Sequence, residues 1–258
     1  MTRDEATKAC TKILQRAMST SATISSVLQL PEVFPEFKEL VFQSHISGKT
    51  FAKKMLSDFL VPRPAEEGWF DKFAEGLAAQ ATINAETVLS AAVIVLAHSN
   101  ADDAFTSACQ IAIGLDPESW IAELNQDKPV VNIGDLRKKS VKELFAAHLE
   151  RLSSRISAKS ILSRSDLLFK HVPIKTHPDI VSAEDAYYKR DKLEEGDKLR
   201  QEIVHGSGLP HIPIAKAAAT VEFLNEAATT AGRSVGFRFN LQIDMKYLAD
   251  LFGYGGKR

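Results

Sequence analysis

The sequence predicts an all-α protein, and three observations support this. Apolar residues recur at every third or fourth position along most of the 258 residues. Strand-like alternation is convincing only in SVGFRFNLQI, residues 234–243. The chain is 45% hydrophobic and has no repeat or low-complexity segment, so it can bury a sizeable core. We expect a helical bundle over 67–232, preceded by an N-terminal helical segment (1–62) and followed by a short C-terminal extension (233–258).

The bundle helices are expected in four stretches: 69–100, 141–156, 182–205 and 214–232. The first is rich in alanine, which favours helix. Two prolines in VPRPAEEG, residues 61–68, mark the boundary before it. Ser182 is a typical N-cap residue, with acidic residues in the turn that follows. Gly206 is typical of the residue that follows a helix.

Composition and charge narrow the function. Residues 1–136 carry a net charge of −7 and residues 137–258 one of +6, so the second part suits an anionic partner. Sequence motifs for phosphate loops, dinucleotide binding, zinc proteases, CxxC redox sites and GxSxG hydrolases are absent. Cys10 and Cys109 read as free thiols of a reducing compartment. The charged start and the shortness of the apolar run 88–97 predict a cytoplasmic protein without a membrane span.

The seven histidines do not form a metal motif. His171 and His177 are six residues apart, as are His205 and His211, and no acidic cluster accompanies either pair. We therefore predict neither a metal nor a cofactor. His148 lies in the apolar stripe of its helix, which is typical of a core or interface histidine.

The stretch LRQEIVHG, residues 199–206, ends the third helix. On a helical wheel Arg200 shares one arc with the apolar side of that helix, which is formed by Leu193, Gly196, Leu199, Ile203 and Val204. His205 follows about 140° round and about 7.5 Å along the axis, in the last turn. Gly196 would allow close approach of another helix. Burying the charge of an arginine on an apolar stripe is costly unless the guanidinium has an acidic partner or lies in a solvent-filled cleft.

This stretch resembles the signature of the HEPN superfamily, in which an Arg, a polar residue, three further residues and a His end the helix before the final one. The resemblance implies a four- or five-helix bundle. It also implies a metal-independent endoribonuclease that works as a homodimer, with two copies of the motif forming one composite cleft for an RNA substrate. The implied setting is a toxin or antiviral-defence system, in which a regulatory or antitoxin protein is a further partner.

The resemblance also assigns roles to residues. Arg200 would hold the scissile phosphate and His205 would act as general acid or base, with Gln201 and Glu202 in support. A histidine near neutral pH and an arginine suit cleavage by the RNA's own 2′-OH. Basic residues of the preceding helices would form the RNA approach surface; these are Arg151, Arg155, Lys159 and Arg164.

Two alternatives remain at this level. One is a non-catalytic HEPN-like dimerisation or nucleic-acid-binding module, favoured by Gln201, where active members more often have Asn, Asp or His. The other is an unrelated helical scaffold, since twelve Arg and seven His in 258 residues give about 0.3 chance matches to Arg-x4-His. The Tyr that follows the His by two positions in toxins paired with nucleotidyltransferase antitoxins is absent, which argues against that subtype.

Overall fold

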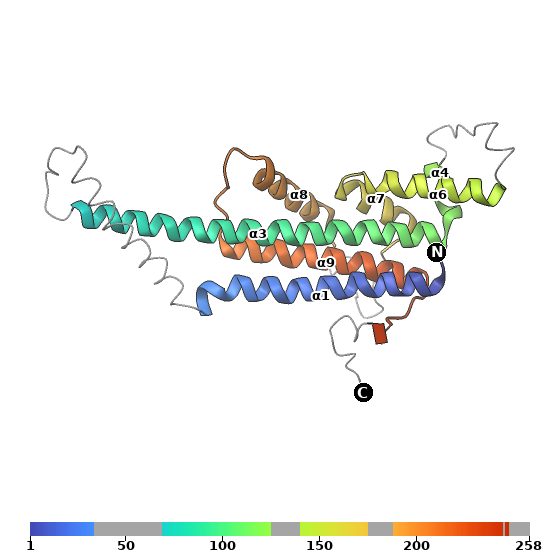
Figure 1. Cartoon of the computed structure of the whole chain (residues 1–258), viewed down its shortest axis with the longest axis horizontal. Helices are drawn as coiled ribbons and strands as arrows, with labels where there is room; N and C mark the ends of the chain where they lie inside the picture. Colours follow the sequence, from blue (N-terminus) through green and yellow to red (C-terminus); the bar gives the residue numbers. More distant parts are fainter. Residues whose placement is uncertain (34–68, 125–139, 175–187, 245, 248–258) are drawn as a thin grey trace.

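The computed structural model describes residues 1–33, 69–124, 140–174, 188–244 and 246–247. Its elements are α1 (Arg3–Val33), α3 (Trp69–Leu115), η1 (Pro117–Trp120), α4 (Ile121–Leu124), α6 (Val141–Ser157), α7 (Ile161–His171), α8 (Arg190–His205) and α9 (Ile214–Arg238) (Figure 1). The described ranges contain no strand. The prediction of an all-α protein is therefore confirmed.

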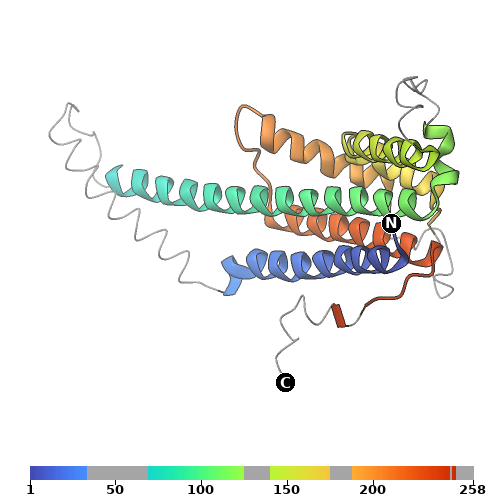
Figure 2. The same ribbon diagram turned by 45° about the vertical axis from the view of Figure 1, so that its right-hand side comes forward.

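Three long helices, α1, α3 and α9, lie side by side and contact one another (Figures 1 and 2). Helices α6, α7 and α8 also contact α3, on the side away from α1. Helix α1 buries Ile13, Ala17 and Ile24 in the same hydrophobic core as α3 and α9. The N-terminal segment is thus, over its described residues, an integral part of the bundle.

Small side chains let the long helices pack closely. The buried faces of α3 and α9 are rich in alanine, including Ala97, Ala101, Ala108, Ala227, Ala228 and Ala231. A Cβ added to Gly232 of α9 would lie 3.0 Å from Ile13 Cγ2 of α1. Glycine at this position therefore sets the distance between α9 and α1.

Helix α9 continues past Gly232 to Arg238, so the strand-like alternation over 234–243 does not correspond to a strand. Val235 is fully buried on the helix face that carries Ala228 and Ala231, and this packing overrides the alternating pattern. Asn240, at φ 49°, ends the helix, and the next N–H, of Leu241, donates to Gly236 O at 2.8 Å.

The helix expected over 141–156 is confirmed as α6. Ser140 caps it and forms a capping box with Glu143. A second serine, Ser160, caps α7. The two serine caps separate two helices that a continuous apolar pattern alone would join.

Helix α8 begins later than expected. Ser182, Glu184 and Asp185 lie outside the described residues, and Lys189, with extended backbone, precedes the first helical residue, Arg190. Tyr188 packs against Phe169, and its hydroxyl donates to Ser165 Oγ at 3.0 Å. These contacts fix the entry into α8. Among the described residues no helix combines the length and the apolar character that crossing a membrane requires.

Candidate functional site in and beside helix α8

Helix α8 is held against α3 by its buried side. Leu193, Gly196 and Leu199 are buried, and Gly196 lies beside Leu224 of α9, as expected for a close helix contact. His98 Nε2 of α3 lies 2.9 Å from Asp197 Oδ1, with 8% and 19% of the two side chains exposed. This pair fixes the middle of α8 to the middle of α3.

The last two turns of α8 carry Arg200 and His205. Arg200 is half-buried, which agrees with its predicted place beside the apolar side, whereas His205 is exposed. Ile203 packs on the core, but Val204, expected on the same arc, is 44% exposed. The physical reason is the inclination of α8, whose C-terminal end lies farther from α3 than its start in both views. The Val204 assignment was therefore wrong.

The supporting residues Gln201 and Glu202 are also exposed. Within the described part of the chain, the side chains of Arg200 and His205 form no hydrogen bond or ion pair with each other or with another residue. Their helical positions, about 140° apart, point them to different sides of α8. One copy of the chain thus presents two separate groups and not an assembled pair.

Gly206 ends α8 as expected, but for a steric reason. Its φ is −68°, and its N–H donates to Glu202 O at 2.9 Å. A Cβ at Gly206 would lie 2.4 Å from that oxygen. The chain can therefore leave the helix here only with a residue that lacks a side chain.

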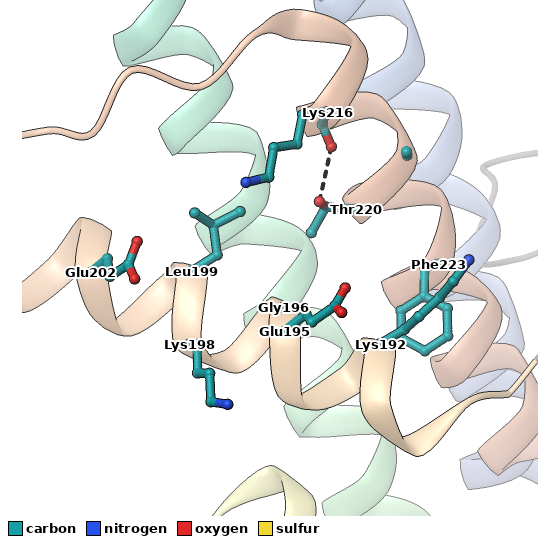
Figure 3. A pocket seen from close by; sticks show the side chains of 10 residues that line it. Lys192, Glu195, Gly196, Lys198, Leu199, Glu202, Lys216, Thr220 and Phe223 are labelled. Atoms are coloured by element: carbon teal, nitrogen blue, oxygen red, sulfur yellow. Dashed lines mark hydrogen bonds between the residues drawn. The ribbon is translucent and has the colours of Figure 1, made fainter.

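A groove of about 440 Å³ runs between α8 and α9 (Figure 3). Its lining is Lys192, Glu195, Gly196, Lys198, Leu199 and Glu202 from α8, and Lys216, Ala219, Thr220 and Phe223 from α9. The inclination of α8 opens this space while its start stays packed on the core. Glu202 connects the groove to the turn that carries His205.

The groove has an apolar wall with charges around it. Leu199 projects towards Lys216, and the Glu195 carboxylate projects from α8 towards α9. Lys192 Nζ lies 5.8 Å from the centre of the Phe223 ring, within the range of a cation–π contact. Lys198 instead points away from α9 and pairs with Glu194 at 2.9 Å. The cations that face the groove are therefore at its two ends, with Glu195 between them.

The residues expected to form an RNA approach surface differ in exposure. Arg151 and Lys159 are exposed, on α6 and just after it, and α6 lies towards the start of α8 (Figure 1). Arg155 is half-buried and donates to Glu123 O at 2.8 Å. Arg164 is 4% exposed and paired with Asp102, so its assignment to the surface was wrong.

Further histidines of the described residues make contacts within the fold. His171 stacks on Trp120, with ring centres 4.3 Å apart, and its Nε2 lies 3.3 Å from Glu123 Oε1. His211 Nδ1 lies 3.2 Å from Thr87 Oγ1, and His148 is half-buried on α6. The described residues hold no grouping of three or more His, Cys, Asp or Glu placed for a metal. His177 lies outside the described residues.

Sequence reasoning missed the His98–Asp197 pair and the groove. A signal existed for the pair, because His98 falls within the apolar pattern of 69–100 and Asp197 is adjacent to Gly196 on α8. The groove had no such signal, because it depends on the angle between α8 and α9.

Comparison with family models, curated proteins and solved structures finds no match to this chain.

Proposed function

We propose that this protein is a metal-independent endoribonuclease of HEPN type, whose site forms when two copies of α8 meet across a dimer axis. The observation that carries the proposal is the presence of a half-buried Arg200 and an exposed His205 in the last turns of a helix that ends at Gly206 and precedes the final long helix. The accompanying expectations are RNA as substrate, a toxin or defence setting, and a cytoplasmic location.

The exposure of the α8 end supports a site completed by a second copy. Val204 of α8 and Leu209, just after it, are 44% and 49% exposed. Exposed apolar side chains of this size at the end of a helix favour burial against another surface. In the proposed dimer, two arginines and two histidines converge, which supplies the groups that one copy holds apart.

The chemistry follows from these groups. One histidine takes the proton of the RNA 2′-OH, and the oxygen then attacks the adjacent phosphorus. The second histidine gives a proton to the departing 5′ oxygen. The arginines stabilise the charge on the pentacoordinate phosphorus through paired hydrogen bonds. The products are a 2′,3′-cyclic phosphate and a 5′-hydroxyl.

A non-catalytic nucleic-acid-binding or dimerisation module is the second candidate. The observation that favours it is the separation of Arg200 from His205 within one copy, together with Gln201 between them.

The test is RNA cleavage by the full chain in EDTA. The catalytic proposal predicts 2′,3′-cyclic phosphate ends, and a loss of about 100-fold or more in rate for either Arg200→Ala or His205→Ala. Arg233→Ala is the matched control, because Arg233 is an exposed arginine of α9. Its rate should equal that of the wild type, and all variants should keep the wild-type molar mass in solution.

Cleavage that survives in both Arg200→Ala and His205→Ala removes these residues from the site. RNA binding by the wild type without cleavage supports the second candidate and overturns the first. A quicker first experiment is expression in cells. Growth inhibition by the wild type that is lost in His205→Ala would support the catalytic proposal.

A further inference from the structure

We propose that the groove between α8 and α9 is a base subsite that selects guanine in single-stranded RNA, with Glu195 as the residue that reads the base. The inference rests on the proposed function for its choice of RNA as the ligand, and it adds a specificity that the Arg–His motif does not supply.

The walls of the groove suit a flat heterocycle. Leu199 of α8 and Ala219 of α9 both line the groove, and Phe223 lies at one end. Gly196 adds no side chain to the lining of the groove, and Leu224 of α9 lies beside it. The volume of about 440 Å³ is sufficient for one nucleotide and small for an extended peptide.

Glu195 determines which base fits. It is exposed, and its carboxylate projects into the groove between two lysines. An ionised carboxylate only accepts hydrogen bonds, through two oxygens. Guanine is the base whose pairing edge offers two adjacent N–H donors, N1–H and the 2-amino group. A guanine in the groove would thus give Glu195 a two-point contact, whereas adenine presents an acceptor at N1.

The lysines provide places for the flanking phosphates. Lys216 Nζ lies above Leu199 at the end near Glu202, and Lys192 lies at the other end, over Phe223. Lys192 is exposed, its Nζ lies over the Phe223 ring, and its charge also acts on Glu226. In the proposed complex a phosphate takes the place of these contacts. Along the groove the order is Lys216, Glu195 and Lys192. In a bound RNA strand these residues would contact a phosphate, the edge of the base and the next phosphate.

The groove is continuous with the proposed cleavage site. Glu195 and His205 are ten residues apart on one helix, which is about 15 Å along its axis. A strand that places a guanine on Glu195 and continues along α8 would therefore bring a phosphodiester beyond the flanking ones to the last turn of the helix.

Binding of fluorescently labelled 2′-O-methyl RNA pentamers to the full chain tests this, because these RNAs lack the attacking 2′-OH. UUGUU should bind about tenfold or more tightly than UUAUU, as expected for a two-point contact to a base edge. The inosine pentamer, which lacks the 2-amino group, should fall between them. Glu195→Gln should bring the ratio of the two affinities to about one.

Matched variants separate the groove from general effects. Glu150→Gln removes an exposed carboxylate on α6 and should leave the ratio unchanged. Ala219→Trp should fill the groove and abolish the guanine preference, whereas Ala146→Trp, at an exposed alanine of α6, should not. Lys216→Ala should weaken all pentamers and lower the slope of log affinity against log salt by about 0.7.

Equal affinity of the wild type for UUGUU and UUAUU overturns the inference, as does a guanine preference that survives Glu195→Gln and Ala219→Trp. Absence of pentamer binding also overturns it. If instead the preference is present while Arg200→Ala and His205→Ala cleave like the wild type, the base subsite stands and the proposed cleavage site fails.

Discussion

Arg164 shows how far the environment of a single residue departs from what its type suggests. Its guanidinium is paired with Asp102 of α3 and donates to Ser157 O at the end of α6. The backbone oxygen of the same residue lies 3.7 Å from Cys109 Sγ. One arginine therefore joins α3, α6 and α7, and its guanidinium lies inside the bundle, away from any surface that could contact RNA.

Removing the partner of Arg164 should be costly. Asp102→Ala leaves a buried guanidinium without its carboxylate, and we expect a loss of about 2–3 kcal/mol in the free energy of unfolding. Asp103→Ala is the matched control, because Asp103 and its partner Arg16 are 67% and 47% exposed; its cost should stay below about 1 kcal/mol. Urea unfolding measures both.

The double variant Asp102→Ala/Arg164→Met should be more stable than Asp102→Ala alone, since it removes the unpaired charge. Equal destabilisation by Asp102→Ala and Asp103→Ala would contradict the assignment of Arg164 as a buried joint.

At the scale of elements, the short segment η1–α4 is anchored by one carboxylate. Glu123 accepts from Lys170 Nζ at 2.6 Å and lies 3.3 Å from His171 Nε2, both in the last turn of α7. The backbone oxygen of Glu123 accepts from Arg155 of α6. The hydrogen bond from Lys170 holds the pKa of Glu123 below its usual range, against the effect of burial, and His171 adds to the lowering.

This anchor should make the α6–α7 region sensitive to acid. A carboxyl group whose pKa is lowered by folding stabilises the native state above its unfolded pKa of about 4.3. That stability is lost as the pH falls from there through the lower pKa of the folded state. Glu123→Gln should therefore lose less stability than the wild type between pH 5 and pH 3.

Thermal unfolding at a series of pH values, with hydrogen exchange of α7 amides, measures this. Glu118→Gln, an exposed residue of η1, is the control and should follow the wild type. If Glu123→Gln and the wild type lose the same stability between pH 5 and pH 3, groups other than Glu123 cause the sensitivity to acid.

At the scale of the whole molecule, α1, α3 and α9 share one core. The reactivity of the two cysteine thiols measures how often this core opens. Cys10 of α1 is 5% exposed and donates to Gly232 O of α9 at 3.3 Å; Cys109 of α3 is fully buried. Burial raises the pKa of Cys10 to about 11 and that of Cys109 to about 12. Neither thiol is appreciably ionised at neutral pH.

Both thiols should therefore react with a disulfide reagent at pH 8 only when the core opens. We expect the two reaction rates to be equal to each other and to rise together with urea, because docking of α1 and integrity of α3 belong to one core. Rates are followed by absorbance, with Cys10→Ser and Cys109→Ser to separate them. Fast reaction of Cys10 alone would show that α1 detaches independently.

The spacing of apolar residues and the residue types at helix ends account for much of the fold that could be predicted from the sequence. The helices over 69–100, 141–156 and 214–232 follow from apolar spacing, and the end of α8 at Gly206 follows from residue type. Two local signals competed at 234–243, where Val235, Phe237 and Phe239 alternate as in a strand, while Val235 also continues the helical spacing of Ala228 and Ala231. Burial of Val235 against the core decided for helix, and a pattern alone has no access to that burial.

For the candidate site, the sequence by itself determined which chemical groups stand in the last turns of α8 and that an apolar side accompanies Arg200. Only the tertiary structure decided that His98 pairs with Asp197, that Arg164 is buried, and that α8 leans away from α9 to leave a groove lined by Glu195 and Lys216. The physical reason is the distance along the chain over which each interaction acts. Helix propensity and capping act between neighbours in the chain, whereas the angle between two helices results from all the side chains packed between them.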